Sequence, residues 1–178
     1  MAKTMQKRIV DTNIPITANL ARSPEKIPDQ LVECVLACVK AIGEVTSRNV
    51  GIVIDVGDEI YNEYRNKLSL SGAPGVGDKF LKWIHDNRWS LPEENRVLIA
   101  PSGDTYLEFP IHDGLKAFDR SDRKFVAVAN AHCSKPPILQ GTDSKWWGWK
   151  KTLAEAGITV LFLCEGYVKK KYAKKIGS

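Results

Sequence analysis

The sequence has few of the residues that build zinc sites, disulfide frameworks or membrane spans. Its four cysteines include no Cys-x-x-Cys pair, and its three histidines lie at no zinc-like interval. We therefore expect buried free thiols, in a protein from a reducing compartment. The longest largely apolar run, 158–164, has seven residues, whereas a membrane helix needs ~20, so no membrane partner is expected.

We expect no secretion signal, because no apolar segment with a cleavage site follows the basic residues near the start. The expected location is the cytoplasm. The 178 residues, 43% hydrophobic and 26% charged, have the size and composition of one globular domain. We expect this domain over 1–166, followed by a basic C-terminal tail over 167–178.

The net charge of +5 arises in this tail. Five of the 26 lysines and arginines lie between 169 and 175, and the remaining 21 equal the number of acidic residues. A lysine cluster attracts nucleic acid through counterion release. The alternative is a solvated, frayed end that only aids solubility.

Hydrophobic patterning predicts strands that alternate with helices. This order is typical of an α/β fold, a three-layer sandwich with a central, mostly parallel sheet and helices on both faces. The segments 96–100 and 106–109 flank Pro-Ser-Gly-Asp and predict an inserted β-hairpin or two short edge segments. The expected strands are 8–11, 50–54, 138–139 and 158–164, and the expected helices are 28–42 (ending before Gly43), 58–68 (capped by Asp58), 78–87, one from 122, and 145–156.

Acidic residues recur where this fold would bring strands and helices to one edge of the sheet. Asp11 ends the first strand, Asp143 follows the strand at 138–139, and Asp122 precedes a helix. Active sites of open α/β sheets lie beyond the carboxyl ends of the strands. Carboxylates gathered there raise each other's pKa unless a cation is present, and Mg²⁺ prefers oxygen ligands. Each acid taken alone is also explained as a helix cap or a solvated side chain.

Four motifs together resemble the signature acids of the PIN-domain nucleases. They are Asp-Thr-Asn at 11–13, Glu-Tyr at 63–64, Asp-x-x-Asp-x-x-x-Val-Ala-Val-Ala at 119–129, and Thr-Asp-Ser-Lys-Trp at 142–146. The resemblance extends over 9–164. It implies a parallel sheet, a Mg²⁺ or Mn²⁺ cluster, and endonuclease activity on single-stranded or structured RNA by a metal-activated water.

The resemblance also assigns roles to particular residues. It makes Asp11, Glu63, Asp122 and Asp143 the catalytic metal ligands, with Asp119 as a neighbour that shares the metal. Asn13 would orient the first acid. Two departures stand out: Gly141 occupies a position that holds a hydroxyl residue in many members, with Thr142 next to it, and Asp58 and Glu59 compete with Glu63 for the ligand role.

Basic and aromatic residues surround these acids and are candidates for binding nucleic acid. Arg120, Arg123 and Lys124 would either meet phosphates or relieve the acidic cluster when metal is absent. Lys145 and Trp146 follow Asp143 directly, and an exposed tryptophan there would stack on unpaired bases. We expect two of the tryptophans at 146, 147 and 149 to face the core and one, Trp146 or Trp149, to face substrate.

Two other functions compete with this interpretation. One is a PIN-like nucleic-acid-binding or scaffold protein without catalysis. The other is a phosphatase with Asp11 as nucleophile, which is disfavoured because such enzymes need a second acid where Asn13 stands. The family resemblance also raises a toxin–antitoxin role with a neutralising partner protein, and a homodimer.

Overall fold

The computed structural model describes residues 5–177. Residues 1–4 and Ser178, at the outer ends of the expected domain and tail, lie outside the described residues. The strands are β1 (Lys7–Val10), β2 (Gly51–Ile52), β3 (Ile54–Asp55), β4 (Arg96–Val97), β5 (Pro101–Ser102), β6 (Thr105–Tyr106), β7 (Ile138–Gln140) and β8 (Val160–Phe162). The α-helices are α1 (Asn13–Ala18), α2 (Val32–Thr46), α3 (Glu59–Lys67), α4 (Val76–Asn87), α5 (Arg123–Ala131), α6 (Lys145–Glu155) and α7 (Glu165–Ile176).

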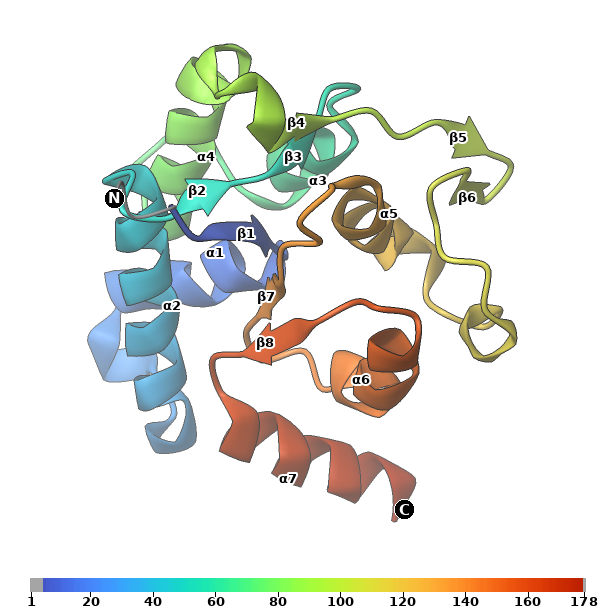
Figure 1. Cartoon of the computed structure of the whole chain (residues 1–178). Coiled ribbons are helices and arrows are strands. Elements are labelled where there is room, and N and C mark those ends of the chain that lie inside the picture. The colour runs from blue at the N-terminus through green and yellow to red at the C-terminus, as the bar shows by residue number, and fades with distance from the viewer. Residues whose placement is uncertain (1–4, 178) are drawn as a thin grey trace.

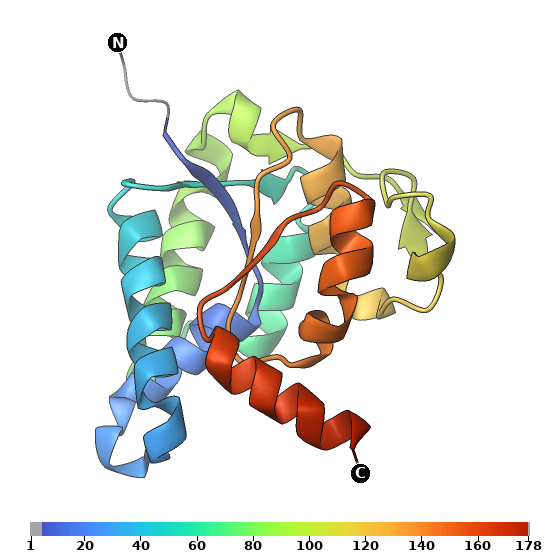
Figure 2. The same cartoon turned by 60° about the horizontal axis from the view of Figure 1, so that its bottom comes forward.

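A parallel sheet with the strand order β2-β1-β7-β8 forms the centre of the molecule (Figure 1). Helices α2 and α4 lie on one side of these strands, and α5 and α6 lie on the other (Figure 2). Because both faces are covered, the central strands are apolar along their length: Ile9 and Ile138, which pair with each other, are fully buried. The α/β three-layer fold predicted from the sequence is confirmed.

The second strand differs from the prediction. The segment 50–54 splits into β2, which pairs with β1, and β3, which pairs with β4 in parallel. The segment 96–100 therefore does not form a hairpin with 106–109. A small hairpin exists between them, where β5 pairs with β6 and Gly103 takes a left-handed φ of 61° in the turn.

Helix boundaries also differ where side-chain partners outweigh local propensity. Helix α2 continues through Gly43, and the chain turns at Arg48, whose φ is 61°. Helix α3 is capped by Asp55 and not by Asp58, because the Asp55 carboxylate accepts bonds from the Glu59 and Ile60 amides at 2.8 and 2.9 Å. The segment 13–18, for which no helix was predicted, forms α1.

The basic tail is helical, which contradicts the frayed-end interpretation. Within α7, Val168 is fully buried, and Tyr172 lies against Gly148 of α6. Helix α7 sits at the end of the sheet where β1 and β7 finish (Figure 2).

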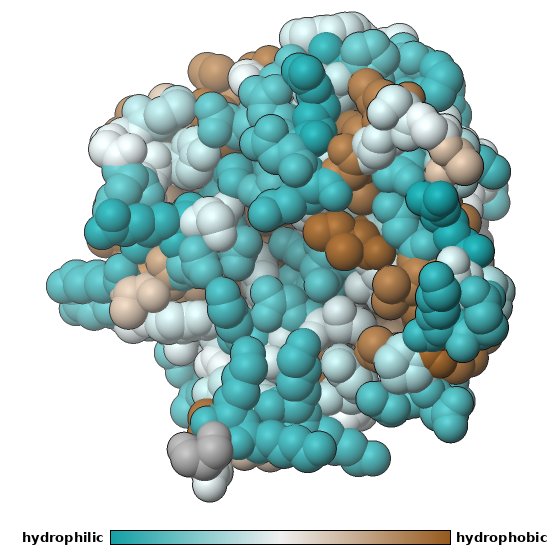
Figure 3. Space-filling model, turned by 180° about the vertical axis from the view of Figure 1, so that it is seen from behind, coloured by the Kyte–Doolittle hydropathy of each residue, from teal (hydrophilic) through white to brown (hydrophobic). Residues whose placement is uncertain are grey.

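The described surface fits a chain with a covered core. One face is mostly hydrophilic, and its hydrophobic side chains form small patches (Figure 3). Three of the four cysteines are buried as expected, whereas Cys133 is exposed. Among the described residues, no helix has both the length and the apolar character needed to cross a bilayer.

Candidate active site

Asp11 is the most deeply buried acid of the predicted site. It follows β1, and its amide bonds to the Leu139 carbonyl at 3.1 Å, so the ends of β1 and β7 are held together. One carboxylate oxygen accepts the Asn13 amide at 2.9 Å. Burial, and next the charge of Asp122, raise the pKa of Asp11 well above its usual value. A buried carboxylate in this state needs a counter-charge if it is to ionise.

Glu63 reaches the same region from α3 and is held by two side chains. Thr12 donates its hydroxyl to one carboxylate oxygen at 3.0 Å, and the Lys124 ammonium forms an ion pair with the other. Glu63 contributes to the raised pKa of both Asp11 and Asp122, so the three acids share one electrostatic environment. Sequence reasoning missed Thr12, although it lies inside the Asp-Thr-Asn motif.

Asp122 lies at the start of α5 without making a side-chain cap to that helix. Burial raises its pKa to about 7, and Asp119, Glu63 and Asp143 raise it in the same direction. Asp119 behaves differently: the Ser121 hydroxyl bonds to it at 2.9 Å and is the main cause of its lowered pKa. Asp119 is thus an ionised neighbour at the rim.

Asp143 follows β7 in a loop fixed by neighbouring hydrogen bonds. Its carboxylate accepts the Lys145 amide at 2.9 Å. The Asn13 side chain accepts the Thr142 amide at 2.5 Å and the Thr142 hydroxyl at 3.2 Å. The expected role of Asn13 is therefore wrong in part: its backbone contacts Asp11, while its side chain holds Thr142.

Gly141 occupies a position where the fold leaves no room for a side chain. A Cβ atom at position 141 would lie 2.6 Å from the Asn13 side-chain oxygen. The glycine therefore makes room for the bond between Asn13 and Thr142. The Thr142 hydroxyl contacts Asn13 and Thr17, at 3.2 and 3.3 Å, and is engaged in holding the loop.

Several predicted site residues point elsewhere. Glu59 accepts the Tyr106 hydroxyl at 2.8 Å, so Glu63 and not Glu59 joins the acids. Arg123 is buried and donates to the Lys116 and Phe118 carbonyls. Its side chain therefore stabilises this loop and does not lie on the surface that nucleic acid could contact.

Two further nucleic-acid candidates also have other partners. Arg120 pairs with Asp104 at 2.9 Å. Trp146 is 1% exposed and packs edge-on against Phe118, so it cannot stack on a base. Trp149, the other candidate, is half-buried and lines a surface pocket.

The donor chemistry of the site fits a hard divalent cation. Asp11, Glu63, Asp122 and Asp143 offer carboxylate oxygens, and mutual repulsion contributes to the raised pKa of two of them. Gln140 is fully buried, and its side chain acts against the rise in the pKa of Asp11 by hydrogen bonding to that carboxylate.

Within residues 5–177, no group of three or more Asp, Glu, His or Cys side chains is placed to hold a metal ion. Lys124 supplies positive charge among the acids. Binding of a cation would therefore require the acidic side chains to change their orientation.

The chain matches no protein-family model, no curated protein and no solved structure.

Proposed function

We propose that this protein is a metal-dependent, PIN-like endonuclease that hydrolyses phosphodiester bonds in RNA. One observation carries the proposal: four carboxylates come from four separate elements at the carboxyl end of the sheet, and Asp122 interacts electrostatically with each of the other three. They come from the end of β1, from α3, from the start of α5 and from the loop after β7. They are Asp11, Glu63, Asp122 and Asp143.

In this proposal the four acids hold one or two Mg²⁺ or Mn²⁺ ions. Such an ion, when bound, supplies a nucleophilic water at neutral pH and stabilises charge on the leaving oxygen. Thr12 holds Glu63 in place through its hydroxyl. Lys124 would leave Glu63 as the cation binds, and its ammonium would then be available to a substrate phosphate.

The test is cleavage of end-labelled single-stranded RNA and DNA in Mn²⁺, Mg²⁺ or EDTA. We expect metal-dependent cutting of RNA, and a loss of at least about 100-fold in Asp143→Asn, because removal of a ligand charge weakens metal binding and transition-state stabilisation. Asp86→Asn is the matched control, since Asp86 is exposed and pairs with Lys82 on α4. Full activity in Asp143→Asn would refute the proposal, and cutting of DNA alone would refute the RNA substrate.

A second candidate is a binding or scaffold protein on the same fold without catalysis. The ion pair between Lys124 and Glu63 favours it, because Lys124 already neutralises part of the acidic charge. A Mn²⁺ titration followed by calorimetry separates the two. The nuclease requires binding that Asp11→Asn abolishes, whereas equal results for wild type and Asp11→Asn would favour the scaffold.

A further inference from the structure

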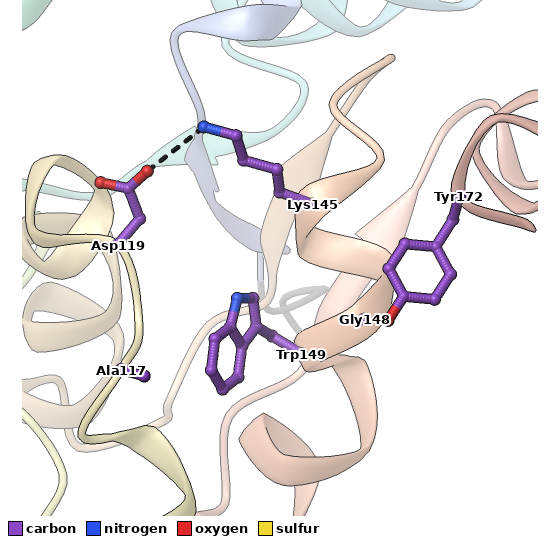
Figure 4. A pocket seen from close by; sticks show the side chains of 6 residues that line it. All are labelled: Ala117, Asp119, Lys145, Gly148, Trp149 and Tyr172. Carbon is purple, nitrogen blue, oxygen red and sulfur yellow. Dashed lines mark hydrogen bonds and ion pairs between the residues drawn. The ribbon is translucent and has the colours of Figure 1, made fainter. Parts of the chain in front are cut away.

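A pocket of about 470 Å³ opens beside the acids, between the loop before α5, helix α6 and helix α7. This volume lies within the range of pockets that bind small molecules or parts of larger ones, about 300–1,000 Å³. The lining residues come from three segments (Figure 4). They are Ala117, Asp119, Lys145, Gly148, Trp149 and Tyr172.

One face of α6 supplies half of this lining. Lys145, Gly148 and Trp149 are spaced i, i+3 and i+4 and therefore share that face. Gly148 allows α7 to approach closely, because a Cβ atom there would lie 2.7 Å from the Tyr172 hydroxyl. The aromatic ring of Tyr172 thereby reaches the pocket from the basic helix.

Trp149 provides an aromatic surface in the pocket. Its ring packs edge-on against Phe118, with centroids 5.5 Å apart, and is half-buried. Figure 4 shows the indole between α6 and the segment that carries Ala117 and Asp119. The core holds one edge of the ring, so the ring is positioned without being fully covered.

One ammonium group, that of Lys145, lines this pocket, and Lys171 lies next to Tyr172 on α7. Lys145 lies 3.4 Å from Asp119, in a pair whose side chains are 60% and 38% exposed, so a phosphate can compete for the lysine. Lys171 of α7 donates to the Thr142 carbonyl at 3.4 Å, directly before Asp143. The pocket thus combines an aromatic face with a cation at the rim of the acidic site.

We propose that this pocket binds one unpaired nucleobase of a single-stranded polynucleotide, next to the phosphodiester at the acids. Trp149 stacks on the base, and Lys145 contacts a neighbouring phosphate. The inference rests on the proposed function for its ligand class. A base inside a duplex is already stacked and cannot enter, so the pocket selects single strands.

The test uses the full chain in EDTA, where binding is measured without cleavage. The probes are short single-stranded RNAs that carry one abasic nucleotide at each position in turn. We expect one position at which the abasic nucleotide weakens wild-type binding by about 10-fold or more, as loss of one stacked base does. Trp149→Leu, which keeps an apolar contact to Phe118, should bind every probe equally, and Trp149→Phe should restore part of the position effect.

Trp147→Leu is the matched control, since Trp147 lies on the same helix and packs against Phe162. It should keep the position effect. A position effect that persists in Trp149→Leu, or none in wild type, would overturn the inference. Cleavage of the same probes in Mn²⁺ reports on the proposed function separately: cutting without a position effect rejects only the pocket, and a position effect without cutting rejects only the nuclease.

Discussion

The Lys124 ammonium forms an ion pair with the Glu63 carboxylate and also donates to the Ser121 carbonyl. Both side chains are largely buried, with 12% and 17% of their surface exposed. The pair holds α5 against α3 at the centre of the acidic cluster. Any cation that enters the cluster must therefore compete with an internal one.

Replacement of Lys124 by Met should make the fold depend on divalent metal. In EDTA at pH 7.5 we expect the free energy of unfolding to fall by about 1–3 kcal/mol, because Glu63 loses its partner in a largely buried position. Mn²⁺ should raise the Tm of the variant by more than it raises that of wild type. Thermal unfolding with and without Mn²⁺ measures both effects. Lys82→Met, which removes an exposed pair with Asp86, should change neither, and an equal Mn²⁺ gain in Lys124→Met and wild type would contradict the prediction.

Asp122 should make the metal-free protein less stable as pH rises. Its pKa is about 7 in the folded protein against an ordinary value of 3.8, so the folded state binds the proton more tightly than the unfolded state does. The sign follows by linkage: stability is greatest below about pH 4 for this group and is lost as pH rises toward 7. Asp11, whose pKa is also raised, acts in the same direction.

The measurement is Tm against pH in EDTA. Asp122→Asn should flatten the decline between pH 4 and 7, because it removes the titrating group. Mn²⁺ should flatten it in wild type. If Tm falls equally with pH in wild type and Asp122→Asn, the pKa of Asp122 is not raised in the folded protein.

Arg123 should matter for stability and Arg120 should not. Arg123 donates to the Phe118 carbonyl at 3.1 and 3.2 Å and to the Lys116 carbonyl at 2.9 Å, with 10% of its side chain exposed. Arg123→Met should lower the free energy of unfolding by about 2–4 kcal/mol, since it leaves buried carbonyls without donors. Arg120→Met, at an exposed position, should stay within about 0.5 kcal/mol of wild type.

Chemical denaturation measures both variants. Arg123→Lys should not recover the loss, because a single ammonium cannot make the forked set of bonds. Recovery by lysine would show that charge alone, and not the fork geometry, holds the loop.

Two glycines in helices should respond to alanine with opposite signs. Gly43 has no atom within 4 Å of an added Cβ, so Gly43→Ala should stabilise the protein by about 0.5–1 kcal/mol through helix propensity. At Gly77 the same atom would lie 1.9 Å from the Pro15 carbonyl oxygen, so Gly77→Ala should cost more than about 2 kcal/mol by forcing α1 and α4 apart. Thermal unfolding measures both variants, and an unchanged or raised Tm in Gly77→Ala would contradict the packing of α1 against α4.

The strands of the central sheet, and the positions of the acids relative to these strands, could be predicted because each depends on a local pattern of residues. Apolar runs mark the central strands; Asp11 directly follows β1, and Asp143 lies in the loop just after β7. The predictions failed where a partner from a distant segment decides the outcome. Asp58 precedes α3 in sequence, yet it pairs with Arg88, which leaves the cap to Asp55.

The same limit explains the misplaced nucleic-acid residues. Arg123 and Trp146 stand beside the acids in sequence, and both turn to partners around Phe118. The hydrophobic periodicity of α5 and α6 does not show that the loop around Phe118 supplies these partners. Thr12 was missed for the complementary reason: its partner Glu63 comes from another helix, and only the folded chain brings the two together.

The pairing of β1 with β7 has a consequence for biosynthesis. Ile9 and Val10 pair with Ile138 and Leu139, so β1 stays without one of its two neighbours until the segment that forms β7 has left the ribosome. Such non-local pairing slows folding and exposes the strand edge meanwhile. Asp11 and Asp143 are consequently kept apart on a nascent chain, and the acidic cluster is assembled only after β7 and the loop that follows it have been synthesised.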